Sequence, residues 1–196
     1  TRFLVTLENG RTVAQPGLLG GPFDAAATAI CVEFNDLAGI EAALATGEVA
    51  AVLTEPVMTN SCMVLPEPGF HAGLRELCTK AGALLVIDET HTISSGLGGY
   101  ARVHGLAPDM FVVGKCVAGG MPTAVWGMTP AVADRLAQVN AKRAQGRTGM
   151  GTTLSANPMQ FACLRATLAE VMTEANYAHM ERLAGVLEAG LSGVIA

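Results

Sequence analysis

Two continuous apolar runs, each ending in charged residues, dominate the hydrophobic pattern of the chain. The first covers residues 84–87 and is followed by Asp88 and Glu89, and the second covers residues 110–113 and is followed, after one glycine, by Lys115. Such a run, bounded by polar and glycine-rich sequence, is typical of a strand buried on both faces of a sheet. Ligands of open α/β sheets bind beyond the carboxyl ends of these strands. We therefore expect an acid and an amine at the carboxyl edge of one sheet.

The neighbouring segments predict an α/β arrangement. Residues 69–80 carry apolar positions at helical spacing, and Gly82 follows them as a stop signal. An apolar run over residues 49–54, which predicts another buried strand, precedes this helix. The run to Asp88 follows the helix, so a βαβ unit with parallel strands is expected. Asp36 is a candidate N-cap for a short helix. We also predict a strand over residues 27–34 and a glycine-rich loop over residues 92–105.

The composition limits the kind of protein. A length of 196 residues predicts one domain. The chain is 51% hydrophobic and 15% charged, with a mean hydropathy of +0.41. It contains no run of eighteen apolar residues, so no membrane span is predicted. We expect the excess apolar surface to meet another subunit or a missing part of the same protein. A net charge of −5 argues against nucleic-acid binding.

The cysteines indicate the redox environment. Their number is odd and no pair has C-x-x-C spacing, so free thiols in a reducing, cytoplasmic compartment are expected. The five residues are Cys31, Cys62, Cys78, Cys116 and Cys163.

Lys115 and Asp88 are the main candidates for chemistry. A lysine at the end of a buried strand is partly desolvated, which favours the neutral amine that attacks carbonyl groups. A nearby carboxylate can hold a pyridine nitrogen protonated. A Schiff-base lysine and a pyridinium partner are what pyridoxal phosphate requires from a protein. The alternatives are a solvated lysine, and a carboxylate used as a helix cap or in a salt bridge. Glu89, adjacent to Asp88, is expected to point the other way.

An ordered series of motifs around these residues resembles the class III aminotransferases, in particular the glutamate-1-semialdehyde aminomutase group. The likeness runs from about Phe34 to the end of the chain. The motifs that carry it are residues 86–92, 108–115, 118–122, Asn60 with residues 66–70, and residues 151–158.

The resemblance implies a fold-type I α/β domain, a three-layer sandwich with a mostly parallel central sheet. It also implies pyridoxal 5'-phosphate as cofactor, a small amino acid or amine as substrate, and a homodimer that shares its active sites. The implied function is transfer of an amino group by an aminotransferase or an aminomutase. The alternatives are a racemase or epimerase of the same family and a catalytically inactive binding or assembly domain.

The resemblance also assigns site residues. Lys115 would form the Schiff base and Asp88 would pair with the ring nitrogen. Thr90 stands where the family commonly has a branched residue on the ring face. His91 stands where many members have a glutamine that hydrogen-bonds the ring hydroxyl, although a polar structural role remains an alternative. Thr153 matches a threonine that binds the cofactor phosphate from the partner subunit, and ordinary turn chemistry is its alternative.

Two residues are expected further from the reaction. Glu55 and Asn60 match family positions that line the same cavity. No metal site is expected, because His91 and His104 lack the spacing of metal ligands.

A glycine motif offers a competing interpretation. Residues 96–101 satisfy G-x-G-x-x-A, which in dinucleotide-binding proteins joins a strand directly to a helix. Here seven residues separate the motif from Asp88 and no helical period follows it. A nicotinamide-dependent dehydrogenase is therefore disfavoured.

The resemblance also indicates missing parts. Family members are roughly twice as long, with a phosphate-cupping segment upstream and a small domain downstream. We therefore expect residues 1–196 to be the cofactor-binding large domain alone, with weak or no activity as an isolated fragment.

Overall fold

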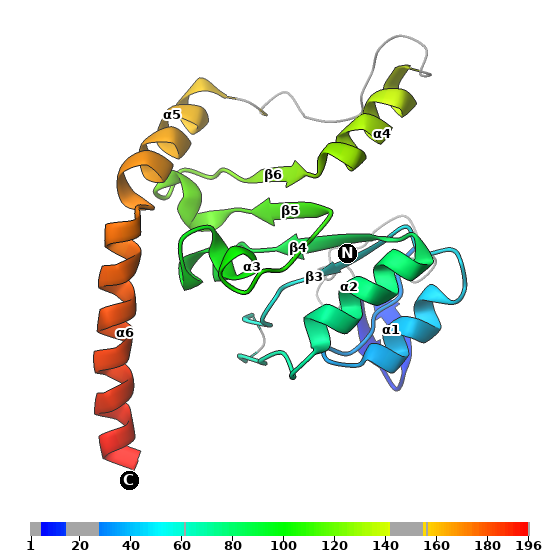
Figure 1. Cartoon of the computed structure of the whole chain (residues 1–196), viewed down its shortest axis with the longest axis horizontal. Coiled ribbons are helices and arrows are strands. Elements are labelled where there is room, and N and C mark those ends of the chain that lie inside the picture. The colour runs from blue at the N-terminus through cyan, green and yellow to red at the C-terminus, as the bar shows by residue number, and fades with distance from the viewer. Residues whose placement is uncertain (1–4, 15–27, 61, 142–154, 156, 196) are drawn as a thin grey trace.

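A four-stranded sheet lies at the centre of the molecule, with the strand order β3-β4-β5-β6 (Figure 1). The computed structural model describes residues 5–14, 28–60, 62–141, 155 and 157–195. The strands are β3 (Ala51–Thr54), β4 (Leu84–Asp88), β5 (Met110–Val113) and β6 (Val125–Met128). β3, β4 and β5 are parallel, and β6 is antiparallel to β5. The predicted α/β fold and its mostly parallel sheet are confirmed.

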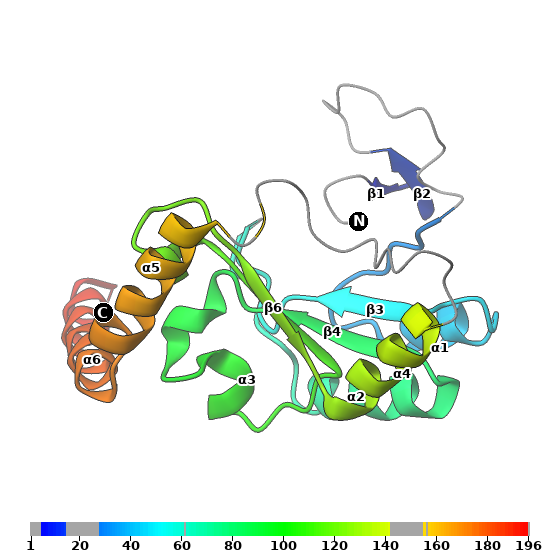
Figure 2. The same ribbon diagram turned by 90° about the horizontal axis from the view of Figure 1, so that it is seen from above.

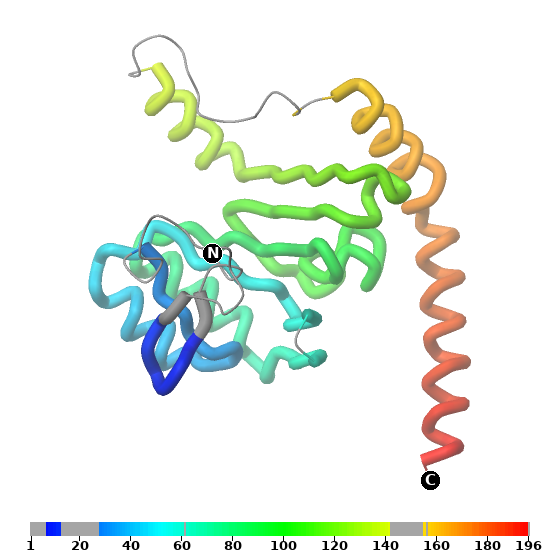
Figure 3. The backbone as a smooth tube through the Cα atoms, turned by 180° about the vertical axis from the view of Figure 1, so that it is seen from behind, coloured from blue at the N-terminus to red at the C-terminus, as the bar shows by residue number. Residues whose placement is uncertain are grey.

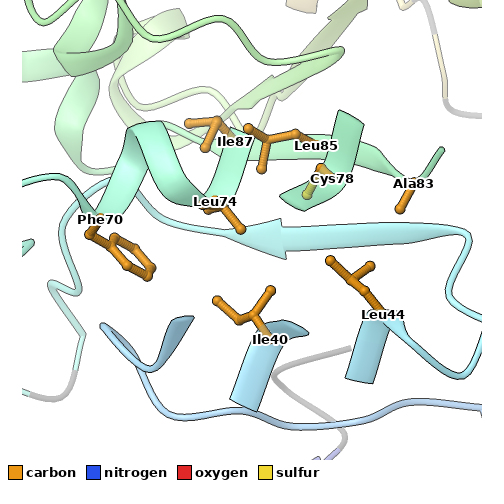
Figure 4. Close-up of a cluster of buried hydrophobic side chains, with 8 residues drawn as sticks. All are labelled: Ile40, Leu44, Phe70, Leu74, Cys78, Ala83, Leu85 and Ile87. Atoms are coloured by element: carbon orange, nitrogen blue, oxygen red, sulfur yellow. The ribbon is translucent and has the colours of Figure 1, made fainter. Parts of the chain in front are cut away.

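Helices α1 (Leu37–Leu44) and α2 (Phe70–Ala81) cover one face of β3 and β4 (Figure 2). Alternate residues of β4 point toward these helices and join a buried apolar cluster (Figure 4). The predicted start of α1 is confirmed, because the Gly39 N–H donates to Asp36 Oδ1 at 2.8 Å. The predicted end of α2 is confirmed as well, because Gly82 adopts a left-handed conformation with φ 71°. The cluster consists of Ile40, Leu44, Phe70, Leu74, Cys78, Ala83, Leu85 and Ile87.

The opposite face of the sheet is less covered. The strand register places Leu53 in one row with Val86, Met110 and Met128. Leu53 is 46% exposed, and Trp126 on the same face is 49% exposed. The prediction that the strand at residues 49–54 is buried is therefore wrong for this face. In the described part of the chain, β3 is an edge strand with helices on one side only.

Two predictions about irregular segments are also wrong. Residues 28–34 form no strand, and the Cys31 N–H instead donates to Thr12 Oγ1 at 3.2 Å. Thr12 belongs to a hairpin of β1 (Val5–Glu8) and β2 (Arg11–Ala14). Residues 92–105 are not a plain loop, because they contain a 3-10 turn (Thr92–Ser95) and the short helix α3 (Gly99–Val103).

The last helices of the described chain are α4 (Pro130–Ala141), α5 (Pro158–Ala166), which continues as a π turn over Thr167–Val171, and α6 (Glu174–Ile195). Of these, α5 and the start of α6 brace the segment that follows β5. Leu164 of α5 packs in a second buried cluster with Ile93, Val113 and Val117. The Tyr177 hydroxyl at the start of α6 donates to the Ile93 carbonyl oxygen at 2.8 Å. This packing holds the polypeptide in place immediately beyond Lys115.

Beyond Tyr177, α6 extends away from the sheet (Figure 1 and Figure 3). Its apolar residues Leu183, Leu187 and Leu191 are exposed. None of the helices in the described ranges is both long and apolar enough to cross a membrane.

Asp109 ties α2 to the amino end of β4. Its Oδ2 atom accepts from the Arg75 guanidinium and from the Leu85 N–H, each at 2.7 Å. Burial by itself would raise the pKa of Asp109, but the Leu85 N–H and the Arg75 charge outweigh burial and lower it. A carboxyl group with a lowered pKa stabilises the folded state only while it is ionised.

We expect this contribution to be complete above about pH 5 and to disappear as the pH falls through about 4 and below. In Asp109→Asn, the free energy of unfolding at pH 7 should fall by about 1 kcal/mol, since the pair is partly exposed. The variant should also lose part of the wild-type dependence on acid pH. Urea unfolding between pH 3 and 7 measures both effects, with Glu76→Gln on the exposed side of α2 as control. Equal pH profiles for wild type and Asp109→Asn would contradict the assignment.

Candidate functional site

The carboxyl ends of β4 and β5 bring Asp88 and Lys115 to the same edge of the sheet. Asp88 is the last residue of β4 and pairs with Val112 of the parallel strand β5. The Glu89 N–H then donates to the Val112 carbonyl oxygen at 2.8 Å. Lys115 lies three residues beyond Val112, so the predicted placement of the acid and the amine at one edge is confirmed.

Lys115 has an unusual backbone conformation. Its φ is 53°, in the left-handed region, which costs a non-glycine residue about 1–2 kcal/mol. The residue opens a 3-10 turn over Lys115–Ala118, and Val117 and Ala118 of this turn are buried. Strained residues of this kind cluster at functional sites. The Lys115 side chain itself is exposed, so the predicted desolvation by a buried strand end is wrong within the described residues.

Asp88 and Glu89 are adjacent in sequence but have different surroundings. The half-buried Asp88 accepts a hydrogen bond at Oδ1 from the Thr90 N–H at 2.9 Å. Glu89 is 0% exposed, on the other side of the chain as predicted. Its carboxylate accepts from the Thr92 hydroxyl at 2.6 Å and from the N–H groups of Tyr100 and Ala101 at 3.1 and 2.5 Å. Asp88 therefore faces the site, whereas Glu89 anchors the following loop.

The same contacts explain the glycine motif of residues 96–101. The expectation that no helix follows it is wrong, because α3 begins at Gly99. The N–H groups at the start of α3 bind the carboxylate of Glu89. A Cβ atom at Gly99, whose φ is 78°, would lie 2.8 Å from Glu89 Oε2, so glycine is needed there. The N–H groups at this helix start are already bound by the Glu89 carboxylate, so they are not available to bind the phosphate of a dinucleotide.

Glu89→Gln should destabilise the fold without changing the charged groups at the site edge. The amide keeps one acceptor oxygen but turns an NH₂ group toward backbone donors, which costs about 2 kcal/mol in a buried position. The free energy of unfolding in urea measures this loss. Asp36→Asn, which keeps an acceptor at the start of α1, is the control. Wild-type stability in Glu89→Gln would contradict the anchoring role.

Thr90 lies between the two strand ends. A Cβ atom built on Gly114, the residue before Lys115, would lie 3.7 Å from Thr90 Oγ1. The threonine hydroxyl that follows β4 is therefore close to the backbone from which Lys115 emerges. This neighbourhood agrees with the predicted position of Thr90 at the site.

His91, three residues beyond Asp88, is held by two residues that follow β3. Thr59 Oγ1 forms a hydrogen bond with His91 Nδ1 and another, at 2.5 Å, with Glu55 Oε2. The Thr59 N–H also donates to Glu55 Oε2, at 3.3 Å. Glu55 Oε2 lies 3.9 Å from His91 Nδ1, and the Glu55 side chain is buried. A continuous polar series therefore links the end of β3 to the end of β4.

The sequence analysis did not identify Thr59. Its contact with His91 joins residues 32 positions apart, so no local pattern could indicate it. The motif that includes Asn60 was the nearest available signal. Asn60 itself is exposed, and Thr153 lies outside the described residues.

His71 supports the segment that carries Glu55 and Thr59. It is half-buried, and its Nε2 forms a hydrogen bond with the Pro56 carbonyl oxygen at 2.9 Å. Burial lowers the pKa of His71, against the opposing effect of the Pro56 bond. The neutral ring thus tethers α2 to the polypeptide immediately beyond Glu55. Among the described residues, no group of three or more His, Cys, Asp or Glu side chains is arranged to hold a metal ion.

Comparison with known proteins shows which family the chain resembles. The family "Aminotransferase class-III" matches residues 16–195. A glutamate-1-semialdehyde 2,1-aminomutase of Nitrosospira multiformis is 37% identical over 188 residues, which cover 94% of this chain and 43% of that protein. One of Anaeromyxobacter dehalogenans is 37% identical over 190 residues, which cover 94% of this chain and 42% of that protein.

Two solved structures are similar as well. A glutamate-1-semialdehyde-aminomutase of Pseudomonas aeruginosa PAO1 has a TM-score of 0.89 and 53% identity over 96% of this chain and 43% of that chain. An omega-transaminase of Sphaerobacter thermophilus has a TM-score of 0.78 and 28% identity over 97% of this chain and 43% of that chain. The chain spans less than half the length of these relatives. The family match covers most of the sequence, and the chain belongs to the class III aminotransferase family.

Proposed function

We propose that this chain forms the cofactor-binding part of a pyridoxal phosphate-dependent enzyme that transfers or shifts an amino group. The observation that supports this most is the placement of Asp88 at the end of β4 and of Lys115 just beyond the end of the adjacent parallel strand β5. Carboxyl edges of parallel strands are where α/β proteins bind ligands. The family and its named relatives agree with this class of reaction.

The residues at the edge fit the chemical groups of the cofactor. Lys115 supplies a primary amine for the aldehyde group, and its exposed side chain is accessible. Asp88 supplies a carboxylate for the pyridine nitrogen. Bound there, pyridoxal phosphate would act as an electron sink for the substrate's α-carbon. A structure of the P. aeruginosa relative, in a lysine-to-alanine variant, is described as a complex with PMP.

Each residue would then have a defined role toward the cofactor. Lys115 would hold it through its amine and would serve as the acid and base for the proton at the substrate's α-carbon. Asp88 would hold a proton on the ring nitrogen. Thr90 would pack on the ring face, and His91 would form a hydrogen bond with the ring hydroxyl. Glu55 and Asn60 stand behind them along the β3 end of the site.

The relatives' names favour an aminomutase over an aminotransferase. The proteins with 37% identity and the structure with 53% identity are glutamate-1-semialdehyde aminomutases, whereas the omega-transaminase shares 28%. We propose a small amino acid or amino aldehyde as substrate. We also propose that residues 1–196 act as a large domain in a homodimer, with Thr153 contacting the cofactor phosphate of the partner's site.

Cofactor trapping tests the proposed function. We expect added pyridoxal phosphate to produce a visible absorption band that borohydride abolishes, with the label recovered on the peptide containing Lys115. Lys80, exposed on α2, is the internal control because it is an equally accessible amine away from the sheet edge. Recovery of the label on Lys80, or the absence of any band, would refute the assignment.

A further inference from the structure

The hydrogen bonds around Thr59 determine which His91 nitrogen carries a proton. A hydroxyl group has one proton and can donate it to only one partner. Thr59 Oγ1 contacts both Glu55 Oε2 and His91 Nδ1. An ionised carboxylate is an acceptor only, and Glu55 Oε2 also receives the Thr59 N–H. The Thr59 hydroxyl must therefore donate to Glu55.

The oxygen of Thr59 is then an acceptor toward the imidazole. Nδ1 of His91 can satisfy it only by carrying a hydrogen, since two lone pairs would otherwise face each other. In a neutral imidazole, a proton on Nδ1 leaves Nε2 without one. The bond to one ring nitrogen thus sets the role of the other.

We propose that Glu55 and Thr59 are positioning residues that hold neutral His91 as the Nδ1–H tautomer, with Nε2 as a proton acceptor at the carboxyl edge of the sheet. Nε2 would accept a hydrogen bond from a hydroxyl or ammonium group of a ligand. This inference rests on the proposed function only for the identity of that donor, which would be the ring hydroxyl of pyridoxal phosphate. A proton gained at Nε2 would leave an imidazolium opposite the Glu55 carboxylate, with Nδ1 3.9 Å from Oε2.

The test reads the tautomer directly in the protein without cofactor. Nitrogen-15 NMR of histidine-labelled protein, about two pH units above the ordinary range of histidine titration, distinguishes protonated from bare ring nitrogens. The chain has four histidines, and His91→Gln assigns the signal by its loss. We expect a protonated Nδ1 and a bare Nε2 for His91. Any other pattern, including a protonated Nε2, overturns the proposal.

A matched pair of variants tests the part played by Thr59. Thr59→Val removes the hydroxyl at nearly constant shape and should shift His91 toward the Nε2–H tautomer, the form free histidine prefers in water. Thr59→Ser restores the hydroxyl and should restore Nδ1–H. If His91 stays Nδ1–H in Thr59→Val, Thr59 does not set the tautomer and the proposal fails. If Thr59→Val does not fold, Thr59→Ala, which also lacks the hydroxyl, provides the same comparison with Thr59→Ser.

Cofactor titration of the same proteins separates this inference from the proposed function. We expect Thr59→Val to bind pyridoxal phosphate about 5-fold more weakly than Thr59→Ser, the effect of one misdirected hydrogen bond. Equal affinities would overturn the link to the ring hydroxyl. If no variant binds the cofactor, the proposed function fails, whereas the NMR result still decides the tautomer.

Discussion

Replacing Lys115 with alanine is expected to lower the rate of amino-group transfer by about 10⁴-fold, or ~5 kcal/mol of barrier. Under the proposed function, the variant would lose both the amine that attaches the cofactor and the base that moves the substrate's α-proton. Because alanine and lysine are both non-glycine residues, the strain of the left-handed backbone is the same in each. The fold should therefore survive. Steady-state turnover of the whole enzyme to which we assign this domain measures the effect, together with loss of the visible cofactor band.

The matched control is Lys80→Ala. Lys80 is an exposed lysine of α2 whose only described ion pair, with Glu41, is long at 3.7 Å. We expect it to retain wild-type turnover. A Lys115→Ala protein that folds and turns over at more than about a tenth of the wild-type rate would show that the reaction does not depend on this amine.

Asp88→Asn and Asp88→Ala are expected to reduce turnover by about 10²–10³-fold, or ~3–4 kcal/mol, because the negative charge at the ring nitrogen is lost. The two variants separate charge from structure. Asparagine keeps an oxygen that can accept the Thr90 N–H, so its local turn should persist. Alanine removes this bond as well and should also lower stability, by about 1 kcal/mol.

The expected signature is similar loss of turnover in both variants with wild-type stability only in Asp88→Asn. Turnover and urea unfolding, measured on the same preparations, provide the comparison. If Asp88→Asn turns over normally, the charge of Asp88 is not used in the reaction. If only Asp88→Ala is impaired, the residue acts through the Thr90 turn alone.

The contrast between Asp88 and Glu89 shows how one strand end serves two purposes. Successive residues of an extended chain point to opposite sides. Asp88 thus faces the site edge, while Glu89 enters the interior and binds the start of α3. The candidate carboxylate of Asp88 therefore lies on a strand whose continuation is held by hydrogen bonds, so its position does not depend on a free loop.

The sequence alone predicted the three parallel strands β3, β4 and β5, the βαβ unit and the common edge of Asp88 and Lys115. These features depend on local patterns: apolar runs of strand length, helical spacing in α2, the cap at Asp36 and the stop at Gly82. Local patterns also distinguish parallel strands, because a helix between two strands carries the chain back to the same edge. The candidate chemistry at the ends of β4 and β5 follows from that topology.

Tertiary structure alone decided three other features. They are the Glu55–Thr59–His91 series of hydrogen bonds, the exposure of Lys115, and the binding of the Glu89 carboxylate at the glycine motif. In the first, the hydrogen bond between Thr59 and His91 connects residues 32 positions apart, and no periodicity encodes the direction of such side chains. The occupation of the glycine motif depends on the buried Glu89 carboxylate, which accepts from N–H groups 11 and 12 residues further along the chain. Burial is a property of the assembled surface, so an apolar run predicts a strand but not what covers each of its faces.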